Sequence, residues 1–242
     1  KKLKIDKAMI ITILVLAWPT MMEQVMSTAV QYIDTAMVGI LGTQATAAVG
    51  ATGTVSWLVN STISAVAVGF LAYISQACGA GDYERARRAS SQSVLAVLIL
   101  GAFFTLVTTG LSGFIPVWMQ VDPTIRSMAS EYFLILYAPM LFRTATIIFG
   151  TILRAVGDSK TPMRVGLWVN LINVILNTLL IFPSRTVEFW GLSFWMPGAD
   201  WGVLGAAIAS AIAFTAGGVI ITLTVSAVIA LTSTKKHKGR YS

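Results

Sequence analysis

Polar side chains recur at helical spacing inside the first apolar stretch of the chain. They follow one another at intervals of three and four residues: Thr20, Glu23, Ser27, Gln31 and Asp34. At 100° per residue, Glu23 and Asp34 differ by about 20° after whole turns, so all five share one helix face. A carboxylate at low dielectric is held either protonated or beside a bound cation. This face therefore predicts a proton or cation site.

A second polar stripe carries three carboxamides. Asn170, Asn173 and Asn177 follow Gly166 at intervals of four, three and four residues. Carboxamide and hydroxyl oxygens are ligands of hard cations. One acid together with three amides and nearby hydroxyl groups therefore predicts a site for H⁺ or Na⁺.

Two further features have more than one interpretation. Thr52, Ser56, Asn60 and Ser64 follow at steady intervals of four, and hydroxyls and amides of this kind commonly hydrogen-bond one helix to another. Arg143 lies halfway along another apolar stretch, where it could pair with an acid or extend to the membrane interface. Six residues are predicted to line a substrate cavity: Glu23, Ser27, Gln31, Asn60, Asn170 and Arg143.

The elements that must position these residues are apolar segments of membrane length. Of the 242 residues, 56% are hydrophobic and 11% are charged, against about 25% charged in an ordinary globular domain. This composition excludes a disordered chain and a nucleic-acid-binding domain, and it disfavours a soluble enzyme. One cysteine and one histidine exclude an internal disulfide and a His/Cys metal cluster. A membrane-spanning helix needs about 20 apolar residues.

We predict an all-α membrane protein whose residues 1–232 form one six-helix bundle. The predicted spans are 8–33, 46–74, 89–115, 128–152, 163–183 and 203–232. Residues 233–242 are predicted to form a basic cytoplasmic tail that begins a linker to a second bundle. Pro19 and Pro139 lie inside spans, where each can bend its helix. Recurrent glycines in the spans are interpreted as close helix contacts.

The distribution of basic residues predicts orientation. Most of the 17 basic residues fall in four segments, at the two ends of the chain (1–7 and 235–240) and in every second connection between spans (85–88 and 154–164). By the positive-inside rule these segments, and both ends of the chain, are cytoplasmic in a multi-pass protein of the plasma membrane. The remaining long connection, 184–202, contains Trp190, Trp195 and Trp201. It predicts a hairpin or a short helix on the outer surface.

Five ordered motifs resemble the multidrug and toxic compound extrusion (MATE) family of secondary transporters. They are Pro19 with Glu23-Gln24 and Asp34–Gly39, then Ser75–Asp82 with Arg85 and Arg88, then Ile152–Met163, then Asn173–Asn177 with Leu179–Phe182, and Gly202–Ser210. The resemblance implies an all-α fold of twelve helices in two bundles, of which this chain would be the N-terminal one. Its partners would be the lipid bilayer, a small organic substrate and the C-terminal six-helix half, with no nucleic acid.

The resemblance also implies roles for single residues. Asp34 would carry the coupling ion, Na⁺ or H⁺, with Asn173, Asn177 and Ser210 beside it, and no cofactor would be needed. Some branches of the family have Asp where this chain has Asn177, which leaves the choice between Na⁺ and H⁺ open. The implied activity is export of drugs or other organic, often cationic, compounds by antiport.

Three other functions compete with this one. A flippase for lipid-linked oligosaccharides should have several cations at depth to meet a pyrophosphate, whereas this chain has Arg143. A non-transporting scaffold should satisfy Glu23 and Asp34 with fixed partners. An intramembrane enzyme is disfavoured, because the spans contain no histidine, no Cys–His pair and no paired metal ligands.

Overall fold

The computed structural model of the protein describes residues 7–189 and 192–238. Eight helices and two strands follow one another in this part of the chain: α1 (Lys7–Ile40), α2 (Thr43–Gly79), α3 (Tyr83–Gly110), α4 (Ile115–Trp118), α5 (Arg126–Tyr137), α6 (Met140–Ala155), α7 (Lys160–Leu180), β1 (Pro183–Phe189), β2 (Leu192–Ala199) and α8 (Gly202–Lys238). Five helices are long and apolar enough to cross a membrane, and the bent pair α5–α6 makes a sixth such segment.

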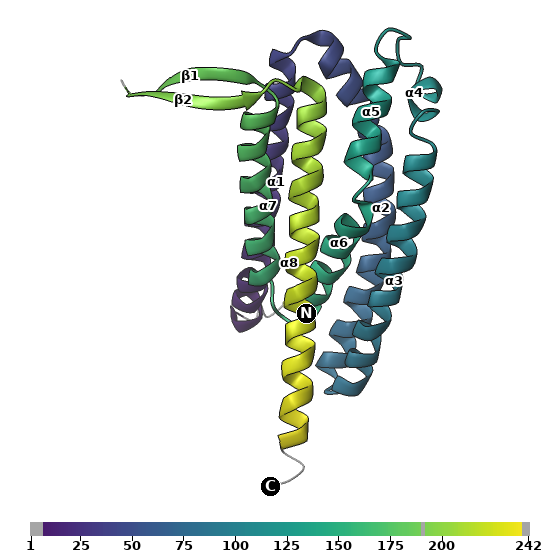
Figure 1. The fold of residues 1–242 in the computed structure, drawn as a ribbon. Coiled ribbons are helices and arrows are strands. Elements are labelled where there is room, and N and C mark those ends of the chain that lie inside the picture. Colours follow the sequence, from purple (N-terminus) through teal and green to yellow (C-terminus); the bar gives the residue numbers. More distant parts are fainter. Residues whose placement is uncertain (1–6, 190–191, 239–242) are drawn as a thin grey trace, which may run out of the picture.

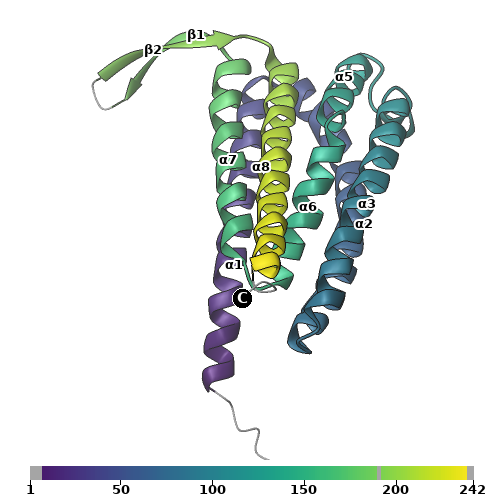
Figure 2. The same cartoon turned by 60° about the horizontal axis from the view of Figure 1, so that its bottom comes forward.

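The helices form one antiparallel bundle with two sides (Figure 1). Helices α1, α7 and α8 pack together on one side, α2 and α3 on the other, and α5 and α6 lie between them (Figures 1 and 2). Each predicted span has a helical counterpart, with ends shifted by a few residues. The largest differences are at α1, which runs on to Ile40 and therefore contains Asp34, and at α8, which continues past 232 to Lys238. Residues 239–242 of the predicted tail lie outside the described residues.

The fourth span is broken where the sequence places a proline. Helix α5 ends at Tyr137, α6 begins at Met140, and their axes meet at 48°. Pro139 lacks the amide hydrogen that would continue the α5 hydrogen-bond ladder, and its ring excludes the preceding turn. The predicted bend at Pro139 is confirmed, whereas α1 continues as one helix through Pro19.

Two tight turns use the same Gly-Asp pair. Gly81 and Gly157 have φ angles of 75° and 92°, in the left-handed region that favours glycine. In each turn the next residue, Asp82 or Asp158, donates its amide to a carbonyl five positions back. Its carboxylate then accepts backbone amides at the start of the next helix. This local chemistry reverses the chain between α2 and α3 and between α6 and α7.

Some of the predicted glycine contacts hold helices together and others do not. A Cβ added to Gly218 would lie 2.5 Å from the Phe142 carbonyl oxygen, and one added to Gly101 would lie 2.5 Å from Leu141 Cδ1, so α6 is fitted closely against α8 and α3. A Cβ at Gly39, Gly50 or Gly53 would meet nothing within 4 Å. Packing within the described chain therefore does not explain these three glycines.

The long connection between α7 and α8 contains an antiparallel hairpin rather than a helix. Strand β1 pairs with β2, with Thr186 opposite Trp195, and the pair projects from one end of the bundle (Figure 1). Trp195 and Trp201 are exposed, as an interfacial position requires. Trp190 lies outside the described residues. The hairpin is the single sheet of the described chain and an addition to an otherwise helical fold.

The predicted basic segments meet at the opposite end. The beginning of α1, the α2–α3 and α6–α7 turns, and the end of α8 all lie there (Figures 1 and 2). We call this end the basic face and the other end the hairpin face. Lys1, Lys2, Lys4 and Arg240 lie outside the described residues. An even number of crossings brings both ends of the described chain to one face.

Candidate functional site

A chain of polar side chains connects α1, α7 and α8 near the hairpin face. The Asp34 Oδ1 atom accepts a hydrogen bond from Asn177 Nδ2 at 2.6 Å. The same amide nitrogen lies 3.1 Å from Asn173 Oδ1, and Asn173 Nδ2 lies 3.0 Å from the Ser210 hydroxyl oxygen. We call these four residues the Asp34 cluster. The sequence predicted all four, and the fold brings them together from three helices.

Burial makes the Asp34 cluster a poor place for an uncompensated charge. Asn173 and Asn177 are 6% and 1% exposed, and Asp34 and Ser210 are half-buried. The Asn177 Oδ1 atom is buried and has no hydrogen-bond partner. A buried acceptor without a donor is costly. It is also an oxygen that a cation can use, because it already lies beside the carboxylate.

The Asn173 amide completes the hydrogen bonds of Asp34. With its nitrogen turned toward α1, the amide donates to the two carboxylate oxygens of Asp34 at 2.9 and 3.0 Å, and its oxygen accepts from the Ser210 hydroxyl at 3.0 Å. The opposite orientation would place the carbonyl oxygen against the carboxylate, where two acceptors repel each other. Asp34 therefore accepts hydrogen bonds from the amides of both Asn177 and Asn173.

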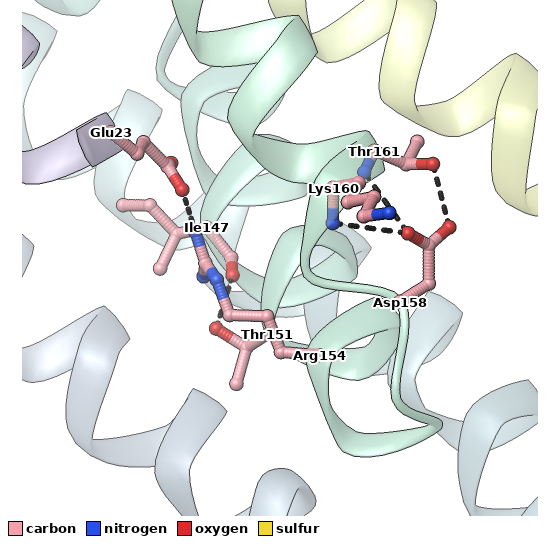
Figure 3. A network of polar contacts seen from close by, with 7 residues as sticks. All are labelled: Glu23, Ile147, Thr151, Arg154, Asp158, Lys160 and Thr161. Carbon is pink, nitrogen blue, oxygen red and sulfur yellow. Dashed lines mark hydrogen bonds and ion pairs between the residues drawn. The ribbon is translucent and has the colours of Figure 1, made fainter. Parts of the chain in front are cut away.

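Glu23, the other acid on this face of α1, has a different environment. Its Oε2 atom forms an ion pair with Arg154 Nη2 at 2.5 Å, between α1 and the last turn of α6 (Figure 3). The two side chains are about one quarter exposed, at 24% and 25%. Gly166 of α7 allows this approach, because a Cβ there would lie 3.2 Å from Glu23 Cγ.

The turn that follows Arg154 is fixed by a carboxylate. The Asp158 side chain accepts hydrogen bonds from the Thr161 hydroxyl at 2.6 Å and from the backbone amides of Lys160 and Thr161 at 3.2 and 3.0 Å (Figure 3). Partial burial opposes the charge, but these donors together hold the pKa of Asp158 below its ordinary value. The carboxylate thus caps α7 and sets the position of the helix that carries the three asparagines.

Arg143 has neither of the partners considered from sequence. It lies in the first turn of α6, and its guanidinium carbon stacks 4.3 Å from the centre of the Phe214 ring of α8. Among the described residues no carboxylate pairs with it. From Arg143 to the end of α6 at Ala155 is about 18 Å along the axis, beyond the reach of an arginine side chain.

The other predicted residues are distributed around the bundle. Ser27 and Gln31 are exposed on α1, and Asn170 is half-buried on α7, one turn before Asn173. On α2, the Tyr137 hydroxyl donates to the Ser56 hydroxyl, which supports the predicted helix-bonding role of that stripe. Asn60 lies one turn further along α2, and its buried Oδ1 atom has no partner.

A model of the MatE family matches residues 19–179, about two thirds of the chain. The chain belongs to the MatE family. Its match covers Asp34, Asn173 and Asn177 and ends before Ser210. The family resemblance inferred from the ordered motifs is confirmed.

Relatives of this MatE chain are named as transporters and multidrug resistance proteins, not as enzymes. A protein of Thermotoga maritima, described as "Probable multidrug resistance protein NorM", is 29% identical over 86% of this chain and 42% of its own length. A "FAD transporter" of Shewanella oneidensis is 26% identical over 65% of this chain and 36% of its own. The chain therefore spans about two fifths of the length of these relatives.

A solved structure shows the same MatE fold. It is described as "Outward-facing conformation of a multidrug resistance MATE family transporter of the MOP superfamily". The TM-score is 0.77 at 24% identity, over 87% of this chain and 43% of that structure. The match thus corresponds to a single bundle of a longer transporter.

The structure gives one residue of this MatE chain a contact that the sequence did not predict. Arg154, in the basic segment 154–164, pairs with Glu23, 131 positions away in sequence. No local spacing links the two residues. The useful signal was the acid itself, because a carboxylate inside a span needs a partner.

Proposed function

We propose that this chain is the N-terminal half of an ion-coupled MatE exporter and that Asp34 binds and releases the coupling ion, Na⁺ or H⁺. The observation that carries the proposal is the Asp34 cluster. Its half-buried carboxylate has amide partners and no basic partner among the described residues. Amides stabilise the carboxylate without neutralising it, so the site retains affinity for a positive ion.

Coupling requires that the affinity for the ion differ between two conformations. The Asp34 cluster joins three helices, so a relative movement of α1, α7 or α8 would separate the carboxylate from its amides. Binding of the ion at the Asp34 cluster would therefore change which helices are held together. Antiport needs such a link between ion binding and the conformation that moves the substrate.

The substrate would be a small organic compound, often cationic, that binds between this bundle and a second six-helix half. Ser27 and Gln31 support this arrangement, because they are polar, exposed and on the same face of α1 as Asp34. Asn60, Asn170 and Arg143 would line the same space. The basic face would lie in the cytoplasm, with the protein in the plasma membrane.

The test is transport by the natural full-length protein in vesicles. Efflux of ethidium, a fluorescent organic cation, is followed under an imposed Na⁺ gradient, an imposed proton gradient, or neither. We expect one gradient to drive efflux and Asp34→Asn to remove that dependence. Gradient-driven efflux that survives in Asp34→Asn would show that the coupling ion binds elsewhere, and no movement of ethidium under either gradient would reject ethidium export.

A further inference from the structure

Arg143 is an unpaired cation in the middle of the bundle. The described residues within reach of its charge are the phenols of Tyr132 and Tyr137 rather than a carboxylate. Stacking on Phe214 stabilises one face of the guanidinium but satisfies none of its five N–H donors. Placing a cation at this depth is costly, and such residues commonly mark a substrate or ion path.

The surrounding backbone adds positive potential at the same place. Arg143 is in the first turn of α6, which begins inside the bundle because Pro139 breaks the fourth span. No side chain caps this helix start. The positive end of the dipole of a half-helix that begins within the membrane attracts negative groups. Two independent features, a guanidinium and a helix start, therefore favour the same kind of ligand.

The position of Arg143 relative to the Asp34 cluster suggests what kind of ligand it binds. Phe214 follows Ser210 by four residues on α8, so Arg143 lies about one helical turn deeper than the cluster. Tyr132 interacts electrostatically with both Asp34 and Arg143. From the start of α8 to Phe214 is about 18 Å along the axis, which is below the level of lipid headgroups. A ligand here would be a transported molecule.

We propose that Arg143 binds the anionic group, a carboxylate or a phosphate, of a small organic substrate. This inference rests on the proposed function and extends it: the exporter accepts organic compounds that carry an anionic group as well as organic cations. The planar guanidinium fork binds either oxyanion in a bidentate manner. Phe214 orients the fork, and the start of α6 complements the charge.

The experiment measures binding with matched probes that differ in one charged group. Flavin mononucleotide and riboflavin differ by a phosphate, and 1-pyrenebutyrate and 1-pyrenebutanol differ by a carboxylate against a hydroxyl group. Their dissociation constants are measured by fluorescence with the purified full-length protein in detergent. We expect the wild type to bind the anion of at least one pair about tenfold more tightly than its neutral partner.

Variants test whether the preference for the anionic probe over its neutral partner depends on Arg143. Arg143→Gln should reduce the ratio of the two dissociation constants to about one. Arg143→Lys keeps the charge without the fork and should retain part of the ratio. Arg185→Gln is the matched control, because Arg185 also stacks on a phenylalanine, Phe182, at 4.3 Å, but beside the hairpin. It should leave the ratio unchanged.

Two results would overturn the proposal: equal binding within both pairs by the wild type, or an undiminished ratio in Arg143→Gln. If Arg143→Gln does not fold, the wild-type ratio and Arg143→Lys decide, and a full ratio in the lysine variant counts against the bidentate contact. Binding is measured without a gradient. A failure of ion coupling therefore leaves this result intact, and a failure here leaves ethidium efflux intact.

Discussion

Two carboxylates on one face of α1 have opposite kinds of partner. Glu23 lies against the guanidinium of Arg154, whereas Asp34 lies against the amides of Asn177 and Asn173. An arginine neutralises the acid, so the pair needs no additional cation. Amides donate hydrogen bonds but leave the net charge unchanged. The two acids therefore differ in the charge of their partners, and the proposed function assigns ion exchange to the one whose partners are neutral.

The two acids also connect different parts of the bundle. Glu23 joins α1 to α6 toward the basic face, and Asp34 joins α1 to α7 and α8 toward the hairpin face. A scaffold would satisfy both acids with fixed partners. Among the described residues Glu23 has a charged partner and Asp34 has amide partners alone, so variants of the two acids can test whether they differ in role.

The largest expected effect is a difference in ion coupling between variants of Asp34 and Glu23. Asp34→Asn should lower the ratio of gradient-driven to gradient-free transport about 100-fold, because the charge that links ion to substrate is removed. Glu23→Gln should lower it less than about threefold, because its partner is structural. Both variants are assayed in the same vesicles at matched protein content. Equal losses would break the contrast.

The next prediction concerns stability rather than transport. Arg154→Gln leaves Glu23 a partly buried charge without its cation and should lower the free energy of unfolding by about 2 kcal/mol. The double variant Glu23→Gln with Arg154→Gln should recover about half of this loss, because no charge remains unpaired. Thermal unfolding in detergent measures all members of the cycle. Strict additivity would mean that the ion pair contributes nothing.

Two asparagines that differ in surroundings sharpen the contrast further. Asn173→Ala removes a partner of Asp34 and of Ser210, and it should reduce gradient-driven transport about tenfold. Asn60→Ala is the matched control on α2, where the amide oxygen is buried without a partner. Since it removes an unsatisfied acceptor and no partner of Asp34, it should leave the ratio of gradient-driven to gradient-free transport unchanged, even if substrate binding weakens. A greater transport loss in Asn60→Ala than in Asn173→Ala would contradict the proposed cluster.

The smallest effect is expected at the α6–α7 turn and depends on pH. The pKa of Asp158 is lowered in the folded state, so its stabilising effect is present above about pH 3.9, the usual value for Asp, and is lost as pH falls through the lower folded value. Asp158→Ala should cost about 1 kcal/mol at pH 7. Unfolding is followed from pH 7 down to about 3, with Asp158→Asn, which keeps an acceptor, as the milder variant. A loss that grows on acidification would refute this.

Much of the fold could be predicted because its causes are local. Apolar length fixed the spans, the absent amide of Pro139 predicted the bend, and the Gly-Asp pairs turn the chain through their own backbone bonds. The Asp34 cluster was also predictable, since helical spacing puts its members on polar faces and the family motifs group them. The pairing of Glu23 with Arg154 was not, because it depends on how α1 and α6 pack. For 184–202 the sequence left a hairpin and a short helix open, and the structure has the hairpin, whose pairs run from Phe189–Leu192 to Pro183–Ala199.

The glycine contacts of α6 also indicate where a transport cycle can take place. The Phe142 carbonyl and the Leu141 side chain leave no room for even a methyl group opposite Gly218 and Gly101, so α3, α6 and α8 pack as one close-fitting unit. The surfaces near Gly39, Gly50 and Gly53 carry no such constraint within the described chain. Any transport movement that carried α1 away from this unit would have to break the ion pair of Glu23 with Arg154 of α6.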